Sequence, residues 1–433
     1  MVNDALFALI KTLSKSEKRH FKLWSTRQKG SQEKKYIQLF RTLDKMDRYQ
    51  EELILKRVPS IKKAQLSNQK AHLYKQLLLS LRLQHKEKEV EIQIREQIDY
   101  AQILFKKGLY LQSLKILDRL KHLAKAKEKP LLQLEILAFE KLIESRYITR
   151  SIKGRAESLT SETERVILQI GGVSQLSNLN LMMYGLYIEK GHIQDEEEVA
   201  EVQAYFERHL PERVVNEDRF FEKYYWYTSH AWYHYILQDW LNYYRNCKKW
   251  TQLFEESPEV KAANPVMYMK GMHNVLNGLF IVRDHFRYLE QMTTLEVFVE
   301  THQNRFDKNT EIRAFLYLNF ARINRHFMEG TFGKGLELVP TILQGLKEYN
   351  RELDNHRKLV FQYKIACCYF GTDDHETAIQ YLNQIINQKA TNLRSDIQCY
   401  ARMLHLIGHF DLGHYGLIQH LAKNVYRVPD YIL

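Results

Sequence analysis

The sequence predicts an all-α protein, and three observations support this fold class. Glycine and proline are scarce, at 17 and 7 of 433 residues. The tight turns and loops of β-sheet proteins are rich in both residue types, so their scarcity disfavours an all-β fold. Residues that favour helices, such as Leu, Lys, Glu, Gln and Arg, are plentiful. The glycines fall between stretches with helical apolar periodicity, which is typical of helices joined by short loops.

Length and composition also restrict the class of protein. A chain of 433 residues is too long for one compact core of ordinary size, so we expect two or three domains or one elongated repeat array. The four cysteines are too few and too irregularly spaced for a disulfide framework. Residues 1–13 lack a signal-peptide pattern, and no stretch of about 18 uncharged apolar residues occurs. We therefore expect a cytoplasmic protein with no membrane partner.

The positive charge is concentrated at the N-terminal end. The formal net charge of the chain is +12. Residues 1–90 contain 21 Lys and Arg against 9 Asp and Glu, whereas residues 91–433 contain 43 of each sign. Residues 1–90 therefore form a basic N-terminal module. Such a module is typical either of a contact with nucleic acid or an acidic surface, or of a lysine-rich exterior that is merely solvated.

Ser14 and Glu17 mark the start of one helix in the basic module. A serine followed three residues later by a glutamate forms a capping box, in which each side chain bonds the other residue's backbone N–H. Helical spacing places Phe21 and Trp24 toward a core and four cations on another face. These cations are Lys15, Lys18, Arg19 and Lys22.

A longer helix is predicted from about Ile61 to about Leu83. Its buried stripe is expected to contain five residues: Leu73, Tyr74, Leu77, Leu78 and Leu81. Two short helices followed by this longer one resemble a helix-turn-helix, in which the start of the second helix enters the major groove. The resemblance implies nucleic-acid contacts by Lys63, Ser67, Asn68 and Lys70. Three helices with basic faces could equally be the first layers of a repeat array.

A sequence pattern repeats from about residue 95 onward. A small residue, an apolar or aromatic residue, a turn residue, an aromatic residue or histidine, a small residue and a Leu occur twice at the same offsets. The two sets are Ala101, Leu104, Gly108, Tyr110, Ser113 and Leu117, and Ala366, Tyr369, Asp373, His375, Ala378 and Leu382. The pattern resembles the tetratricopeptide repeat, in which small residues let two antiparallel helices approach. This resemblance implies an α-solenoid of stacked helix hairpins over residues 91–433.

Eight positions are predicted to be the turns of successive hairpins. They are Gly108, Gly154, Gly191, Asp239, Asp284, Gly330, Asp373 and Gly413. The intervals between them all exceed the repeat length of about 34 residues in regular tetratricopeptide proteins. The helices or the loops between hairpins should therefore be longer than in that family.

The expected function follows from the geometry of such an array. A hairpin cannot bury its own apolar side, so stacked hairpins share a continuous core and leave a long concave surface. Surfaces of this kind bind extended peptides or helices of other proteins. In the tetratricopeptide family the first helix of each hairpin lines the groove. The resemblance assigns this role to residues 220–238, 266–283, 312–328 and 358–370.

Aromatic residues are abundant over residues 220–250 and form two stripes on a helix. The stripes are Tyr224, Tyr227, Ala231 and Tyr235, and Trp226, His230, Tyr233 and Leu237. A helix with two apolar stripes is buried on two sides, which is ordinary packing inside a solenoid. Alternatively, one stripe lines the groove and anchors a peptide. The partner-binding residues predicted on this alternative are Lys223, Tyr224, Tyr227, His230 and Arg245.

No sequence pattern predicts a metal, cofactor or catalytic site. His230 and His234 are four residues apart, as are His405 and His409, and this spacing can place two ligands on one metal. No third ligand is organised near either pair. Phosphate-binding loops, dinucleotide-binding glycines, nucleophile elbows and kinase signatures do not occur in the sequence.

We therefore expect a non-enzymatic scaffold or adaptor that binds a protein or peptide in its groove. An alternative uses both ends of the chain, because it resembles the bacterial peptide-sensing regulators that couple an N-terminal helix-turn-helix domain to a tetratricopeptide array. A hydrolase within the helical array is a third hypothesis, although no residue pattern favours it.

Overall fold

The computed structural model describes eight stretches of the chain, and their regular structure is helical. These stretches are residues 4–27, 35–86, 89–146, 154–193, 195–212, 219–350, 352–387 and 395–426. No β-strand occurs within them, so the predicted all-α class is confirmed. None of the helices in these stretches combines the length and the hydropathy that a bilayer crossing requires.

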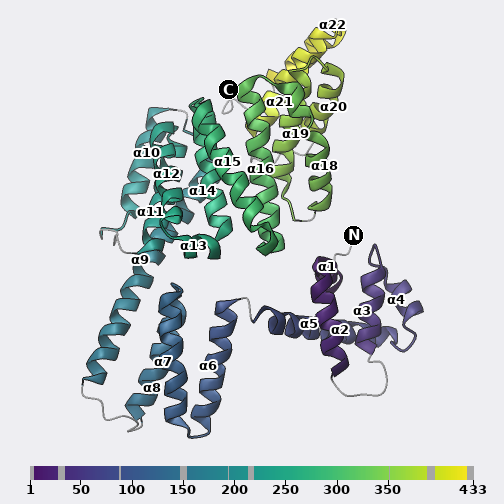
Figure 1. Cartoon of the computed structure of the whole chain (residues 1–433). Helices are drawn as coiled ribbons and strands as arrows, with labels where there is room; N and C mark the ends of the chain where they lie inside the picture. Colours follow the sequence, from purple (N-terminus) through teal and green to yellow (C-terminus); the bar gives the residue numbers. More distant parts are fainter. Residues whose placement is uncertain are drawn as a thin grey trace. The chain divides into compact units, whose positions relative to one another are not determined.

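The chain divides into two compact units, residues 1–170 and residues 171–433. Unit 1 contains eight helices and the beginning of a ninth (Figure 1). They are α1 (Ala5–Thr12), α2 (Lys15–Arg27), α3 (Lys35–Lys45), α4 (Glu51–Arg57), α5 (Lys63–His85), α6 (Val90–Lys106), α7 (Tyr110–Ala126), α8 (Pro130–Arg146) and α9 (Arg155–Lys190). The last of these, α9, continues into unit 2.

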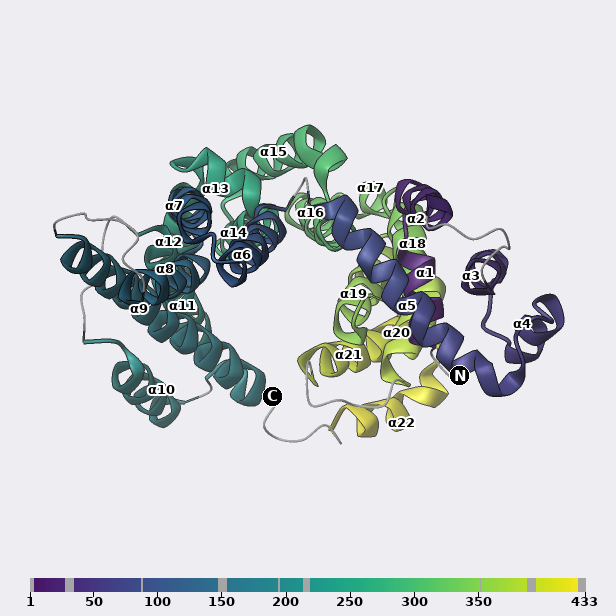
Figure 2. The same cartoon turned by 90° about the horizontal axis from the view of Figure 1, so that it is seen from below.

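Unit 2 is built from the rest of α9 and the helices that follow it, which Figure 2 shows from a second direction. The helices as far as α16 are α10 (Glu196–His209), α11 (Phe220–Ile236), α12 (Trp240–Glu255), α13 (Pro258–Ala263), α14 (Pro265–Ile281), α15 (His285–His302), the 3₁₀ helix η1 (Gln303–Arg305) and α16 (Lys308–Glu329). The remaining helices are α17 (Phe332–Leu336), α18 (Val339–Glu348), α19 (Asn355–Phe370), α20 (His375–Ile386), α21 (Ser395–Asp411) and α22 (Tyr415–Tyr426).

The basic N-terminal module has a hydrophobic core of its own. Its buried side chains come from α1 to α5 and the loops between them. The predicted capping box begins α2, since the Ser14 N–H donates to Glu17 Oε2 at 2.7 Å and the Glu17 N–H donates to Ser14 Oγ at 3.2 Å. Phe21 is buried in this core and Trp24 packs against it, as predicted. A second core joins α6, α7 and α8.

The stripe through which α5 packs on this core is narrower than the sequence predicts. Leu73 and Leu77 are fully buried, and Leu81 packs against the same core. The prediction that Tyr74 and Leu78 are buried is wrong, because their exposed fractions are 38% and 45%. Each lies about 100° around the helix from the leucine before it, and that rotation turns it toward solvent.

The predicted turns lie between consecutive helices. All five glycines among them have a left-handed backbone, with φ between +66° and +77°. Asp373 has the same conformation. At the two remaining turns the left-handed residue is Gln238 or Arg283, and the next residue, Asp239 or Asp284, caps the following helix with its carboxylate. The turn positions are therefore confirmed as breaks between helices.

One stretch departs from the expected succession of hairpins. Between the turns at Gly154 and Gly191 the chain forms a single helix, α9, of 36 residues. The two turns therefore share one helix, whereas separate hairpins would need two. Neither Gly171 nor Gly172, in the middle of α9, has the positive φ that would end the helix.

Small residues of the repeated pattern lie at contacts between helices. Ala101 and Ser113 are fully buried, and Ser113 Oγ donates to the Ala101 carbonyl at 2.8 Å, which ties α7 to α6. Ala366 of α19 and Ala378 of α20 are also fully buried, and α19 packs on α20. Small side chains therefore allow the close approach of helices that the pattern predicts.

In unit 2, helices pack chiefly on their neighbours along the chain. The pairs in contact include α11 with α12, α12 with α14, α15 with α16, α19 with α20, and α21 with α22. In addition, α14 packs on α16 and α16 packs on α19, so these three long helices follow one another side by side (Figure 1). One extensive hydrophobic core runs from α11 to α19.

Candidate functional site

Four aromatic rings connect α14, α16 and α19. The ring of His273 on α14 stacks on Tyr317 of α16 with the centroids 4.7 Å apart, and it lies 6.0 Å from Phe320 on the same helix. Phe320 in turn stacks on Phe361 of α19, with 4.2 Å between centroids and 8° between ring planes. These contacts set the three helices in a fixed register.

A cation lies one turn before a ring of this set on each of the three helices. Lys270, Arg313 and Arg357 precede the ring of their own helix by three or four residues, and residues at this spacing share one side of a helix. We name the rings and the cations around them the cation–aromatic face. It consists of Lys270, His273, Arg313, Tyr317, Phe320, Arg357, Phe361 and Lys364.

Lys364 lies one turn beyond the ring of α19. Its Nζ donates to Asn324 Oδ1 on α16 at 2.6 Å. The same ammonium group lies 5.1 Å from the ring centroid of Phe327 and 5.7 Å from that of Phe280. Lys364 therefore links α19 to both α16 and α14 through polar and cation–π contacts.

The three cations before the rings are close enough to repel one another. Burial lowers the pKa of the Lys270 ammonium group, and the charges of Arg357 and Arg313 lower that pKa further. The Lys270 Nζ also lies 5.6 Å from the ring centroid of Trp232 on α11. Among the described residues, Lys270 and Arg313 make no ion pair with a carboxylate. Both side chains are half-buried.

Arg357 differs from its two neighbours because it has a carboxylate partner. Its guanidinium group pairs with Asp354. Asp354 also caps α19, where it accepts a hydrogen bond from the Arg357 backbone N–H at 2.8 Å. The group of Lys270, Arg313 and Arg357 thus holds three positive charges and one paired carboxylate.

The rings of the cation–aromatic face are neutral at physiological pH. Burial lowers the pKa of His273 to about 3, and the charges of Lys270, Arg357 and Lys364 contribute to this shift. Burial raises the pKa of Tyr317, although nearby guanidinium groups oppose that shift. The charge of this face is therefore carried by its lysines and arginines.

Of the five predicted partner-binding residues, Lys223, Tyr227 and His230 share one side of α11, because they follow one another at spacings of four and three residues. Tyr224 is buried among aromatic rings of α12. The ring of Tyr227 lies 5.9 Å from the ammonium group of a lysine of α12. His230 packs edge-on against a phenylalanine of α10, and burial lowers its pKa. Lys223 is half-buried, and Arg245 is exposed on α12.

The predicted nucleic-acid contacts on α2 are mostly exposed. Lys15, Arg19 and Lys22 are exposed, whereas Lys18 pairs with Asp44 through Nζ and Oδ1 2.8 Å apart. Because the charge of Lys18 is compensated within the module, three of the four cations remain available on this helix.

Of the four predicted nucleic-acid contacts on α5, three are exposed and one is in an ion pair. Lys63, Ser67 and Asn68 are exposed in the first turns of the helix. Lys70 pairs instead with Asp4 and donates to a tyrosine hydroxyl at 3.0 Å. Lys70 therefore links α5 to the residue that caps α1.

The two groups of exposed polar residues are far apart along α5. Gln84 Nε2 donates to Ser16 Oγ at 3.2 Å, and His85 lies 3.2 Å from Glu17, so α2 begins beside the C-terminal end of α5. Ser67 lies about 25 Å from there along the helix, at a rise of about 1.5 Å per residue. His20 contacts Ser80 at 2.9 Å, so α2 runs back along α5 toward Ser67, and nucleic-acid binding stays a prediction from the sequence.

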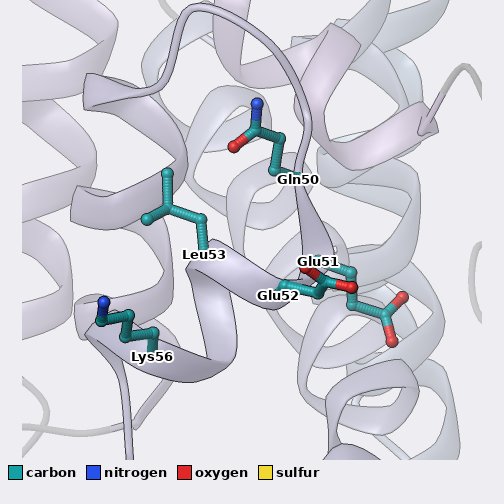
Figure 3. A pocket seen from close by; sticks show the side chains of 5 residues that line it. All are labelled: Gln50, Glu51, Glu52, Leu53 and Lys56. Atoms are coloured by element: carbon teal, nitrogen blue, oxygen red, sulfur yellow. The ribbon is translucent and has the colours of Figure 1, made fainter.

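Other places in the described part of the chain offer less chemistry. No group of three or more His, Cys, Asp or Glu residues there is arranged to hold a metal ion. An open depression of about 520 Å³ lies at the start of α4. Figure 3 shows that its side chains spread along one short helix and do not converge. They are Gln50, Glu51, Glu52, Leu53 and Lys56.

No family model, curated protein or solved structure matches this chain. The cation–aromatic face, which joins α14, α16 and α19, is the described site with the most distinctive chemistry. Sequence reasoning missed its cations, although three of the stretches assigned to the groove contain or adjoin them. The available signal was a cation three or four residues before an aromatic residue, repeated in α14, α16 and α19.

Proposed function

We propose that this protein is a non-enzymatic scaffold that binds an extended peptide, or an extended segment of a partner protein, across α14, α16 and α19. In this proposal the helix pairs form a tetratricopeptide-like solenoid, and the cation–aromatic face lies on its concave side. The ring contacts from His273 to Phe361 carry the proposal, because they hold α14, α16 and α19 side by side in a fixed register.

Two further observations support a solenoid. The contacts of unit 2 follow the order of the chain, as expected where each repeat touches chiefly its neighbours. The left-handed turns recur between the long helices. The four cysteines are free thiols, which suits the reducing cytoplasm that we expect for this scaffold.

Peptide binding can be tested by photo-crosslinking. Peptides are first selected from a random display library on the full chain. A benzophenone amino acid then replaces either Asn274, one turn after Lys270 on α14, or Val297, which is 55% exposed on α15. We expect the selected peptides to crosslink at position 274 and not at position 297.

Two results would contradict this proposal. One is a selection that enriches no peptide, and the other is equal crosslinking at the two positions. Far-ultraviolet circular dichroism and melting temperature serve as controls, because both substituted proteins must remain folded for the comparison to hold.

A further inference from the structure

The cation–aromatic face has an excess of positive charge at one end. Lys270 and Arg313 have no carboxylate partner among the described residues, and Arg357 has one, Asp354. The excess within this group is therefore two positive charges. Two unpaired cations held close together and half-buried destabilise the folded state, because each loses hydration and repels the other.

The geometry positions the side chains of Lys270, Arg313 and Arg357 to bind an anion. The register of α14, α16 and α19 is set by the stacked rings from His273 to Phe361, so the cations one turn away are held by rigid elements. Arg313 and Arg357 can each donate several hydrogen bonds in a planar fork, while Lys270 adds a point charge. Trp232 covers one side of the Lys270 ammonium group.

We propose that Lys270, Arg313 and Arg357 bind a phosphate group carried by the peptide that lies across the cation–aromatic face. This inference rests on the proposed function. The charge excess favours a phosphate over a carboxylate, because a phosphorylated side chain carries about −1.5 to −2 charges at neutral pH and offers three acceptor oxygens.

The same arrangement disfavours nucleic acid as the ligand. Single-stranded nucleic acid needs a row of cations that follows successive phosphates and exposed rings on which bases stack. Here the excess charge is gathered at one point. Tyr317, Phe320 and Phe361 have exposed fractions of 7%, 9% and 0%, so these rings are covered and cannot stack on bases.

Binding of labelled peptide pools to the full chain tests this inference. One pool of random 12-residue peptides has a fixed central phosphoserine, and the second pool has serine at that position. Fluorescence anisotropy is expected to show at least tenfold tighter binding of the phosphorylated pool. Lys270→Met and Arg313→Gln should each reduce this preference at least fivefold.

Matched variants separate a local site from the general charge of the protein. Lys248→Met and Arg305→Gln each remove one exposed cation outside the cation–aromatic face, and both should keep the preference. Lys270→Met and Arg313→Gln should melt no lower than the wild type, since each relieves repulsion. Inorganic phosphate should raise the melting temperature of the wild type more than that of Arg313→Gln.

The possible failures are distinguishable. Equal binding of the two pools, unchanged in Arg313→Gln, would overturn the phosphate site and leave the proposed peptide scaffold intact. Binding of neither pool, together with tight binding of an oligothymidine that Arg313→Gln weakens, would overturn both proposals.

Discussion

His273 is a titratable side chain that the fold keeps neutral. Its ring is stacked on Tyr317 and faces three cations. Burial holds its pKa at about 3 in the folded protein, whereas a histidine in an unfolded chain titrates near pH 6.5. Between these two pH values the imidazole is protonated in the unfolded state and neutral in the folded state, so folding becomes less favourable as the pH falls.

The consequence is a measurable loss of stability in acid. The contribution of neutral His273 is fully present above about pH 6.5 and is lost as the pH falls toward 3. We expect His273→Phe, which keeps a ring against Tyr317, to make the dependence of the unfolding free energy on pH shallower by about 1.4 kcal/mol per pH unit between pH 6 and 4.

Urea titrations at several pH values would measure this slope. The exposed His420→Phe variant is the matched control, and it is expected to keep the wild-type slope. A His273→Phe protein with an unchanged slope would show that this imidazole is protonated in the folded state.

The sequence predicts the roles of only some individual residues. The capping box at Ser14 and the left-handed glycines depend on local backbone chemistry, so a few neighbouring residues predict them. The pairing of Lys18 with Asp44 and the convergence of Lys270 with Arg357 depend on contacts between distant segments. Equal totals of acidic and basic residues over positions 91–433 concealed that local excess of charge.

At the scale of helices, glycine allows α14 to lie close to α12. A Cβ atom added to Gly271 would lie 2.9 Å from Thr251 Cγ2 and 3.1 Å from the Trp250 ring. At Gly278 an added Cβ would lie 3.2 Å from the Tyr244 Cβ. These distances are shorter than ordinary van der Waals contacts, so a larger residue must displace the facing side chains of α12 or the helix itself.

We therefore expect Gly271→Ala to lower the unfolding free energy by about 1–3 kcal/mol. The gain in helix propensity of about 0.5–1 kcal/mol only partly offsets this cost. Gly185→Ala in α9 is the matched control, since no atom lies within 4 Å of an added Cβ there, and it should raise stability by about 0.5–1 kcal/mol. Chemical denaturation measures both values. Equal stabilisation by the two substitutions would show that the contact between α12 and α14 can accommodate an added methyl group.

Helix positions were more predictable than the way helices are combined. The turn residues reveal where helices end, and the groove stretches predicted at 266–283 and 312–328 correspond to α14 and α16. The continuous helix between Gly154 and Gly191 was missed, because spacing between turns does not reveal whether one helix or two fill the interval.

At the scale of the whole molecule, stability is expected to be local to each unit. In unit 1 the buried Lys121 of α7 lies 3.0 Å from Glu140 of α8 and 3.2 Å from Glu162 of α9. Arg155 of α9 also pairs with Glu140. Removing one partner of a buried ion pair costs about 3–5 kcal/mol when the other charge is left uncompensated, and the loss of Lys121 should cost less because Glu140 keeps Arg155.

Lys121→Met should therefore accelerate amide hydrogen exchange in α7, α8 and the first half of α9. Exchange in α14 and α16 should remain as in the wild type, because these helices belong to the other compact unit and local unfolding is confined to contiguous cooperative units. Mass spectrometry of the exchanged protein measures this directly. The exposed Lys115→Met on the same helix is the control. A uniform acceleration over the described helices would show that the two units unfold as one.

The helix α9 spans the boundary between the two units and contains a glycine pair there. At 36 residues it is about 54 Å long, and Gly171 and Gly172 lie where one unit gives way to the other. Glycines lower the stability of a helix, since each lacks a side chain and gains the most freedom when the helix opens. Under tension along α9, we expect the backbone hydrogen bonds around this glycine pair to break before those of the rest of the helix.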